Sequence, residues 1–571
     1  MSNAALEISI GETLSLLDGD FAEVAAGVAN DQYAMWLGSG ISLTKFTGLE
    51  GVVQIVLDHL QVRVDLGNPD CVFRRSLDRI LSLASLTKEE WQNADYTKPI
   101  AEWRDRERIC KSLTGNYAPM LDQFPEGTDP DYLVWTAIDV VARYGDLAVT
   151  PGPEHLGLAA LIAEGAASDT ASANWDPLIE RATEHLVGVT APGLLQVRVL
   201  PEDVQDNSAR ARLYKFHGCA VLAGTGGPTY RDKIVGRASQ IHGWEKKNKV
   251  IAGKLLDLAI SKSTLMLGLS TQDTNIQTVF VVAQDYLPAA FPTHPPAVVL
   301  SENEVGGHQI SLLQNFYGSD FAAKRQAIET SALLRSYGQS LLPALWLHVV
   351  CAKLEALVSF GAPALPAPNI EKLRVSLRQL RDGIGAAAQG MSQEDFMLEA
   401  LPVAGRSVAL FRDGRALAAP AGVYTPLSIN CVAKTLADPN LSSSGLPQLA
   451  LAAALIGYGA TTGTWSCSIS DPANLKSGSV RVTSNLRTAE VFFAANTQAA
   501  NRLVSDGRAA ENDNVIIIHS HAIPLAAPRN PKAPPGRTLP RGRQEISLAS
   551  FCDSATDLDS LFMVFRSGIR L

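Results

Sequence analysis

The sequence lacks paired cysteines. It has seven cysteines in 571 residues, and no two of them form a Cys-x-x-Cys pair. Zinc ribbons hold their metal with such pairs, so this class of protein is excluded. The odd cysteine count, and a polar, acidic start from Met1 to Asp20 without the features of a signal peptide, favour a reducing compartment. We therefore expect a cytoplasmic protein.

Long apolar runs and an excess of positive charge are also missing. The apolar stretch from Leu449 to Gly457 is much shorter than the roughly 20 residues that cross a bilayer, so no membrane partner is expected. A net charge of −9 excludes a protein that coats nucleic acid over its whole surface. With 46% hydrophobic and 19% charged residues, the chain is typical of a globular protein. Its length predicts two or three domains.

The alternation of apolar runs with helical patterns predicts the fold. Over residues 1–330 it indicates βαβ units and an α/β, Rossmann-like, mainly parallel sheet, with a helical insertion at about 50–135. Residues 331–400 are expected to form a helical connector with a Pro-rich linker, residues 363–368. Short alternating segments in residues 401–571 predict a β-rich, α+β domain that regulates the protein or binds a partner.

Four short motifs follow apolar runs that are typical of buried strands. Their order along the chain predicts a nucleotide pocket at the strand ends of one sheet. They are Gly38-Ser39-Gly40-Ile41-Ser42, Asn174-Trp175-Asp176, His217-Gly218, and Gly268-Leu269-Ser270 followed by Asp273.

The glycine motifs are suited to phosphate binding. In Gly38-Ser39-Gly40, glycine lets the backbone approach a phosphate, and the N-terminus of a following helix favours negative charge. An ordinary tight turn is the alternative. Gly268 and Ser270 would complete a cradle for a diphosphate or ribose at the same edge.

Two further polar positions are open to two interpretations each. Asp273 could line the same cradle or cap the helix that starts near Asn275. Ser301 and Asn303 end the next strand, where they could contact an adenine or its ribose, or form a turn.

The candidate catalytic groups are an amide, a carboxylate and an imidazole. Asn174 and Asp176 are two residues apart, so on an extended segment their side chains point the same way. The amide can hold a water or ribose hydroxyl that the carboxylate orients, although an Asx turn before the helix near Pro177 is the alternative. His217 ends a strand beside a glycine and suits general base work, whereas a lone histidine is more often structural.

Together these motifs resemble the sirtuin family over roughly residues 20–330. The resemblance implies catalysis by Asn174 and His217. It implies NAD binding by the glycines and serines of the motifs. Deacylating sirtuins carry a four-cysteine zinc module between the His-Gly and Gly-x-Ser motifs; this chain has none, so zinc is not expected. The version Leu267-Gly268-x-Ser270-x-x-Asp273 is similar to a bacterial defence branch whose members hydrolyse NAD to nicotinamide and ADP-ribose.

The resemblance therefore predicts an NAD+ hydrolase that acts as the toxic effector of an anti-phage, abortive-infection system, with NAD as substrate. An NAD-dependent protein deacylase and a non-catalytic sensor of NAD or ADP-ribose are the alternatives. Members of this branch also imply a homo-oligomer or an assembly with a nucleic-acid-sensing partner, such as a short Argonaute or a ring ATPase.

The second half offers two weaker signals. His519 and His521 could bind a metal, but the sequence shows no further ligand beside them, so we expect no metal there. The segment from Arg529 to Arg543 is basic, rich in proline and free of acidic residues. It is either a solvated loop or a contact for phosphate, nucleic acid or an acidic partner.

Overall fold

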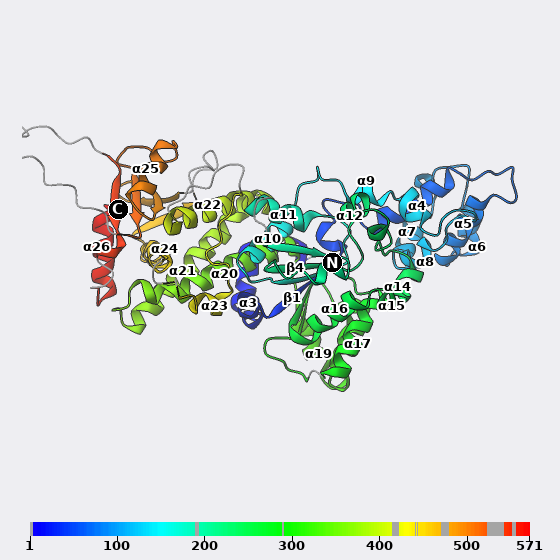
Figure 1. The fold of residues 1–571 in the computed structure, drawn as a ribbon, viewed down its shortest axis with the longest axis horizontal. Coiled ribbons are helices and arrows are strands. Elements are labelled where there is room, and N and C mark those ends of the chain that lie inside the picture. Colours follow the sequence, from blue (N-terminus) through cyan, green and yellow to red (C-terminus); the bar gives the residue numbers. More distant parts are fainter. Residues whose placement is uncertain are drawn as a thin grey trace, which may run out of the picture.

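The computed structural model describes residues 4–188, 193–287, 290–413, 422–439, 441, 444–469, 479–521, 542–550 and 555–571. Figure 1 shows an elongated molecule with a helical part at one end and the C-terminal sheet at the other. A parallel sheet lies between them.

The larger sheet confirms the predicted α/β fold. Within the described residues, seven strands lie in the order β3-β4-β2-β1-β5-β6-β7, and every neighbouring pair is parallel. The strands are β1 (Tyr33–Leu37), β2 (Asp169–Ser172), β3 (Leu195–Arg198), β4 (Ala211–Lys215), β5 (Ser263–Leu267), β6 (Val298–Ser301) and β7 (Leu333–Leu334).

Helices cover both faces of this sheet, which is why its central strand is apolar throughout. Successive side chains of β1 point to opposite faces. Tyr33, Met35 and Leu37 pack in a core with α2 (Ile10–Asp18), α3 (Ala22–Ala29), α10 (Pro153–Ala163) and α20 (Gly338–Gly361). Ala34 and Trp36 pack in a second core with α16 (Lys249–Ser261), α17 (Thr274–Tyr286) and α18 (Gly307–Tyr317).

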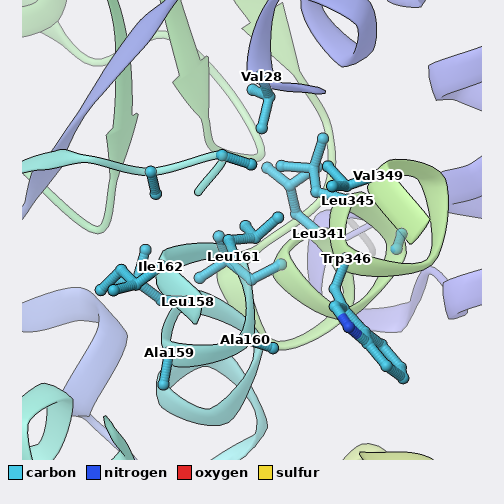
Figure 2. Packing of buried hydrophobic residues seen from close by; sticks show 14 of the residues in the cluster. Val28, Leu158, Ala159, Ala160, Leu161, Ile162, Leu341, Leu345, Trp346 and Val349 are labelled. Carbon is cyan, nitrogen blue, oxygen red and sulfur yellow. The ribbon is translucent and has the colours of Figure 1, made fainter. Parts of the chain in front are cut away.

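Helix α20 is the longest element of the core. Figure 2 shows Leu158 and Leu161 of α10 beside Leu341 and Leu345 of α20. Among the described residues, α20 is the helix long and apolar enough to cross a membrane, but 67% of its most apolar window is buried inside the protein. Its composition is accounted for by this packing.

The predicted insertion between the first two motifs is helical and has a core of its own. It emerges between β1 and β2 and forms the end of the molecule at the right of Figure 1. Its α-helices are α4 (Leu49–Gln61), α5 (Val72–Leu83), α6 (Lys88–Asn93), α7 (Arg106–Thr114), α8 (Tyr117–Leu121) and α9 (Val140–Tyr144).

The C-terminal part contains a separate mixed sheet, as predicted. Its order is β12-β11-β10-β9-β8; β10, β11 and β12 are parallel, while β9 is antiparallel to both of its neighbours. The strands are β8 (Trp465–Ile469), β9 (Val480–Ser484), β10 (Thr488–Ala494), β11 (Val515–His519) and β12 (Gln544–Ser547), followed by α26 (Leu558–Ile569).

Two features around this sheet correct the sequence interpretation. The part after residue 400 also contains most of α22 (Gln393–Asp413) and all of α24 (Leu446–Thr461). Helix α24 is buried on most sides, so it has no polar stripe to reveal its period. The Pro-rich segment 363–368 connects two helices that pack together, α20 and α21 (Ala367–Ala387), rather than two domains. Proline favours the first turn of a helix, and α21 begins inside the segment.

Candidate functional site

The site lies at the carboxyl ends of β4, β2, β1 and β5, which are neighbours in the sheet. The loops after these strands carry the four motifs. In open α/β sheets, ligands bind in the crevice outside the carboxyl ends, where the strand order reverses direction. Here β2, β3 and β4 lie on one side of β1, and β5, β6 and β7 lie on the other. The strand order therefore reverses at β1, and a crevice is expected at its carboxyl end.

A cavity of about 390 Å³ lies at this edge. We call it the first cavity. Nearly all of the site residues predicted from the sequence line it: Gly38, Ser39, Gly40, Ser42, Asn174, Asp176, His217, Gly268, Ser270 and Asp273.

The glycines bring two loops into direct contact. Gly38 N donates to Leu267 O at 3.0 Å, and Gly40 N donates to Gly268 O at 3.0 Å. A Cβ on Gly40 would lie 2.4 Å from the Cα of Gly268, which itself has φ +59°. These two amides are therefore engaged within the protein, and the segment Ser39–Ser42 is a single 3₁₀ turn rather than an α-helix. The glycines thus shape the wall of the cavity, and phosphate binding by this loop stays a prediction.

Asn174 presents an unsatisfied acceptor. Its backbone N donates to Ser172 Oγ at 3.1 Å, and its Nδ2 donates to Ser42 Oγ at 3.4 Å. The side chain is 6% exposed, and its Oδ1 has no hydrogen-bond partner among the described residues. Buried polar atoms are almost always paired, so this oxygen is suited to accept from a ligand hydroxyl or a water in the cavity.

His155 supports Asn174 through Ser42, and no sequence pattern pointed to this histidine. Gly152 N donates to its Nδ1 at 3.1 Å, so the ring hydrogen is on Nε2, which donates to Ser42 Oγ at 3.2 Å. Glu154 Oε1 lies 3.2 Å from the same Nδ1, but this nitrogen already accepts from Gly152, so the two are not hydrogen bonded. Ser42 thus accepts from both His155 and Asn174, and its own hydroxyl can donate into the cavity.

Asp176 combines the two roles considered for it. Its Oδ1 accepts from Leu178 N at 3.1 Å, which makes the Asx turn before α11 (Leu178–Val187). The same side chain, 6% exposed, lines the first cavity.

Lys215 fastens the loop of Asn174 and Asp176 to the end of β4. Its Nζ donates to Asp176 O at 2.5 Å and to Glu180 Oε1 at 2.9 Å. Burial opposes the charge on this lysine, but the Glu180 carboxylate outweighs it and the pKa of Lys215 is raised. The buried ammonium therefore stabilises the loop that carries Asn174 and Asp176.

His217 is buried, with 3% of its surface exposed. Its Nε2 accepts from Asn275 Nδ2 at 3.0 Å, and Asn275 Oδ1 accepts from Ile276 N, which fixes the orientation of the amide. Burial lowers the pKa of His217, and Asp273 and Asn275 oppose this only in part. The imidazole is therefore neutral at neutral pH, the form that a general base requires.

Asp273 is not a cap. It precedes α17, but its side chain makes no capping bond to that helix within the described residues. Instead its Oδ1 accepts from Tyr117 Oη at 2.7 Å. Tyr117 belongs to α8 of the insertion and lines the first cavity, a role that the sequence did not indicate.

A second cavity, of about 760 Å³, shares Gly40, Leu43, Gly268 and Ser270 with the first. The remaining predicted residue, Asn303, lines this second cavity, where its Oδ1 accepts from Ala5 N at 3.3 Å.

Two other polar residues lie at this second cavity or beside it. Ser301 is turned away, because its hydroxyl donates to Ser336 O at 2.5 Å. Glu302 lines the cavity, and burial raises its pKa to about 7.

Residues 170–321 match the model of the SIR2-like domain. The matched segment starts in β2 and contains Asn174, His217 and Gly268; it leaves out Gly38 to Ser42 and the whole insertion. The SIR2-like domain supports the sirtuin-like resemblance and indicates an enzymatic function that uses NAD. No curated protein matches the chain.

Outside the SIR2-like domain, the predicted histidine pair is held by protein groups. His519 Nε2 lies 2.9 Å from Glu545 Oε2, and His521 Nδ1 lies 2.9 Å from Ala495 O. In the part of the chain that the structure describes, no group of three or more His, Cys, Asp or Glu side chains could hold a metal ion.

Most of the predicted basic segment, residues 529–541, lies outside the described residues. Its last residue, Arg543, pairs with Glu511 at 2.6 Å and with Glu545 at 2.7 Å. This arginine is therefore engaged within the protein.

Proposed function

We propose that this protein hydrolyses NAD+ to nicotinamide and ADP-ribose, and that it does so as the toxic effector of a bacterial anti-phage system. One observation carries the chemical part. Asn174, with its unsatisfied Oδ1, and the neutral base His217 lie in loops that follow different strands, β2 and β4, and both line the same cavity.

The chemistry needs little more than positioning. When the bond between nicotinamide and ribose breaks, its electron pair leaves with nicotinamide and positive charge develops on the sugar carbon. A water molecule forms the new bond to that carbon. In this proposal Asn174 holds the water or a ribose hydroxyl. His217 Nε2, which accepts from Asn275 in this structure, exchanges that bond for the water, accepts the water proton and passes it to solvent. Positioning supplies most of the acceleration, because the nicotinamide is a good leaving group.

The two cavities suit the two halves of a dinucleotide. Their volumes, about 390 and 760 Å³, are in the usual range of roughly 300–1,000 Å³ for ligand pockets. They are adjacent, because both are lined by Gly40, Gly268 and Ser270. The nicotinamide end belongs beside Asn174 and His217, and the adenosine half in the second cavity.

The proposal is tested by incubating the purified chain with NAD+ and separating the products by chromatography. We expect nicotinamide and ADP-ribose from the wild type. Asn174→Ala and His217→Ala should each lower turnover by about 100-fold or more, since a positioned base contributes about 10²–10⁴-fold. Circular dichroism should show that both variants are folded.

His294→Ala is the matched control, because His294 is exposed and pairs with Glu23 on the surface. It should turn over NAD+ like the wild type. Wild-type rates in Asn174→Ala or His217→Ala would refute the assignment. Turnover that requires an acetylated peptide would indicate a deacylase, and binding of NAD+ without turnover would indicate a sensor.

The effector role is tested in cells. Bacteria that express the wild-type chain should lose NAD+ after phage infection, and bacteria that express Asn174→Ala should not. Unchanged NAD+ in both strains would separate the enzyme from a defence role. Assembly with itself or with a nucleic-acid-sensing partner is part of the same proposal.

A further inference from the structure

The helical insertion reaches the base His217 through one side chain. Tyr117, in α8, donates its hydroxyl to Asp273 Oδ1 at 2.7 Å across 156 positions of sequence. Both residues line the first cavity with His217, and both also line a smaller cavity of about 180 Å³ on their other side. Their contact is thus part of the wall of the site.

The Asp273 carboxylate accepts a hydrogen bond from Tyr117 and, among the described residues, makes no capping bond, although it lies at the start of α17. Burial lowers the pKa of the His217 imidazole, and the negative charge of Asp273, which lines the same cavity, opposes this in part. Burial, followed by the charge of Asp273, also raises the pKa of Tyr117 well above its usual range, so the phenol stays a neutral donor.

A carboxylate beside a buried imidazole can favour one of two states. If it is well satisfied by a neutral donor, the imidazole can stay neutral and basic. If it is not, its unbalanced negative charge favours the protonated form of the imidazole. A protonated His217 cannot accept a proton from water.

We propose that Tyr117 is a positioning residue for His217: its hydroxyl holds the Asp273 carboxylate and thereby keeps the imidazole in its neutral form. This inference rests on the proposed function. It makes the helical insertion part of the catalytic apparatus, because α8 must be docked on the sheet edge for the tyrosine to reach Asp273. The docking has a second support, since Asp122 next to α8 accepts from Ser239 N at 2.8 Å.

Other ionisable groups that face the same cavity set the background for any titration of His217. They come from the insertion and from the loop after β2, and they are Glu50, Tyr144 and Asp176. Of these, Tyr144 is a close analogue of Tyr117. It lines the cavity too, but its hydroxyl donates to a backbone carbonyl, Thr47 O, at 2.6 Å.

The test compares pH profiles of kcat/KM for NAD+ hydrolysis. In Tyr117→Phe the carboxylate loses its neutral donor, so the acidic limb should move to higher pH by about one unit. In Asp273→Asn the negative charge is gone, so the limb should move to lower pH. The double variant should follow Asp273→Asn, because without the carboxylate the tyrosine has nothing to hold. If Tyr117 were merely structural, the two single variants would not shift the acidic limb in opposite directions. Nor would the double variant behave like Asp273→Asn.

Tyr144→Phe is the matched control, and its acidic limb should stay where the wild-type limb is. The ring nitrogens of His217 should be titrated in parallel by NMR, with His217→Gln to assign the signal, because this readout needs no turnover. If the wild type binds NAD+ but does not hydrolyse it, the proposed function is refuted. The NMR titration of His217 then still tests the role of Tyr117. An unmoved His217 titration in Tyr117→Phe, or an equal shift in Tyr144→Phe, would overturn the inference.

Discussion

Two buried ionisable side chains, two residues apart, have different charge states: one is charged and the other is neutral. Lys215 and His217 are 1% and 3% exposed, and burial alone disfavours the charged form of both. Lys215 has a carboxylate partner, Glu180, at 2.9 Å, so it stays charged and supports the loop of Asn174. His217 has a neutral amide partner, Asn275, at 3.0 Å, and burial outweighs the opposing effects of Asp273 and Asn275, so the imidazole stays neutral. The same strand end thus supplies a fixed cation and a base.

The charge state of His217 gives a prediction for pH. Its pKa is lowered from 6.5 by burial, so the basic form should persist below that pH. A base is lost when it takes a proton, so kcat/KM for NAD+ should be flat around neutral pH. It should fall only on the acidic side of 6.5. Steady-state rates measured as a function of pH check this, and an acidic limb above 6.5 would contradict it.

At the scale of elements, the catalytic edge depends on the close approach of two loops. The loops after β1 and β5 are joined by hydrogen bonds from Gly38 and Gly40 to the carbonyls of Leu267 and Gly268. These contacts allow no Cβ between them, so glycine is needed for packing here. The same packing sets the wall that the two cavities share.

Gly268→Ala should therefore destabilise the protein and weaken NAD+ binding. Its φ of +59° disfavours alanine, and the new Cβ would lie 2.6 Å from Gly40 Cα. We expect a loss of about 1–3 kcal/mol in the free energy of unfolding, measured by denaturant titration, with a higher Kd for NAD+.

Gly253→Ala in α16 is the matched control, since no described atom lies within 4 Å of its Cβ position. It should be stabilising by roughly 0.5–1 kcal/mol, because alanine is the better helix former. If the two variants had the same stability, the steric argument would fail.

At the scale of the whole molecule, a buried ionic network ties the part that contains the parallel sheet to the C-terminal part. Glu164 at the end of α10 and Lys353 of α20 are both fully buried. Lys353 Nζ donates to Glu164 Oε2 at 2.5 Å and to Ser428 O at 2.7 Å, and Leu427 N donates to Glu164 Oε1 at 2.9 Å. Burial lowers the pKa of Lys353, and the Glu164 carboxylate opposes this.

Lys353→Met should leave an uncompensated buried carboxylate. Removal of one partner from a buried pair costs about 3–5 kcal/mol, so the urea midpoint should fall strongly. Because the network contacts both parts, spectroscopic probes placed in each part should report the same lowered urea midpoint.

Arg325→Met is the control on the surface. Arg325 is 57% exposed and pairs with Glu329 at 2.7 Å. Such a pair contributes about 0–1 kcal/mol, so its removal should barely move the midpoint. A small effect of Lys353→Met, or unfolding of the C-terminal part alone, would show that the network does not couple the two parts.

The elements that sequence patterns predicted well are those with short apolar runs or clear end signals. The run Tyr33 to Leu37 is a strand, and the helix that starts at Pro153 ends before Gly165. Helix α24 was missed because an apolar segment buried on most sides has no visible period. The Pro-rich segment was misinterpreted because proline is equally at home in a linker and at a helix start.

By itself the sequence determined which residue types stand at the strand ends, and this was enough to place Asn174, His217 and Gly268 at one edge, because parallel strands bring their carboxyl ends together. Only the tertiary structure decided what holds and tunes them. Tyr117 meets Asp273 across 156 positions, Asn275 meets His217 across 58, and His155 meets Ser42 across 113. The charge of a buried group depends on its desolvation and its partners, and both are supplied by segments that are distant in the chain.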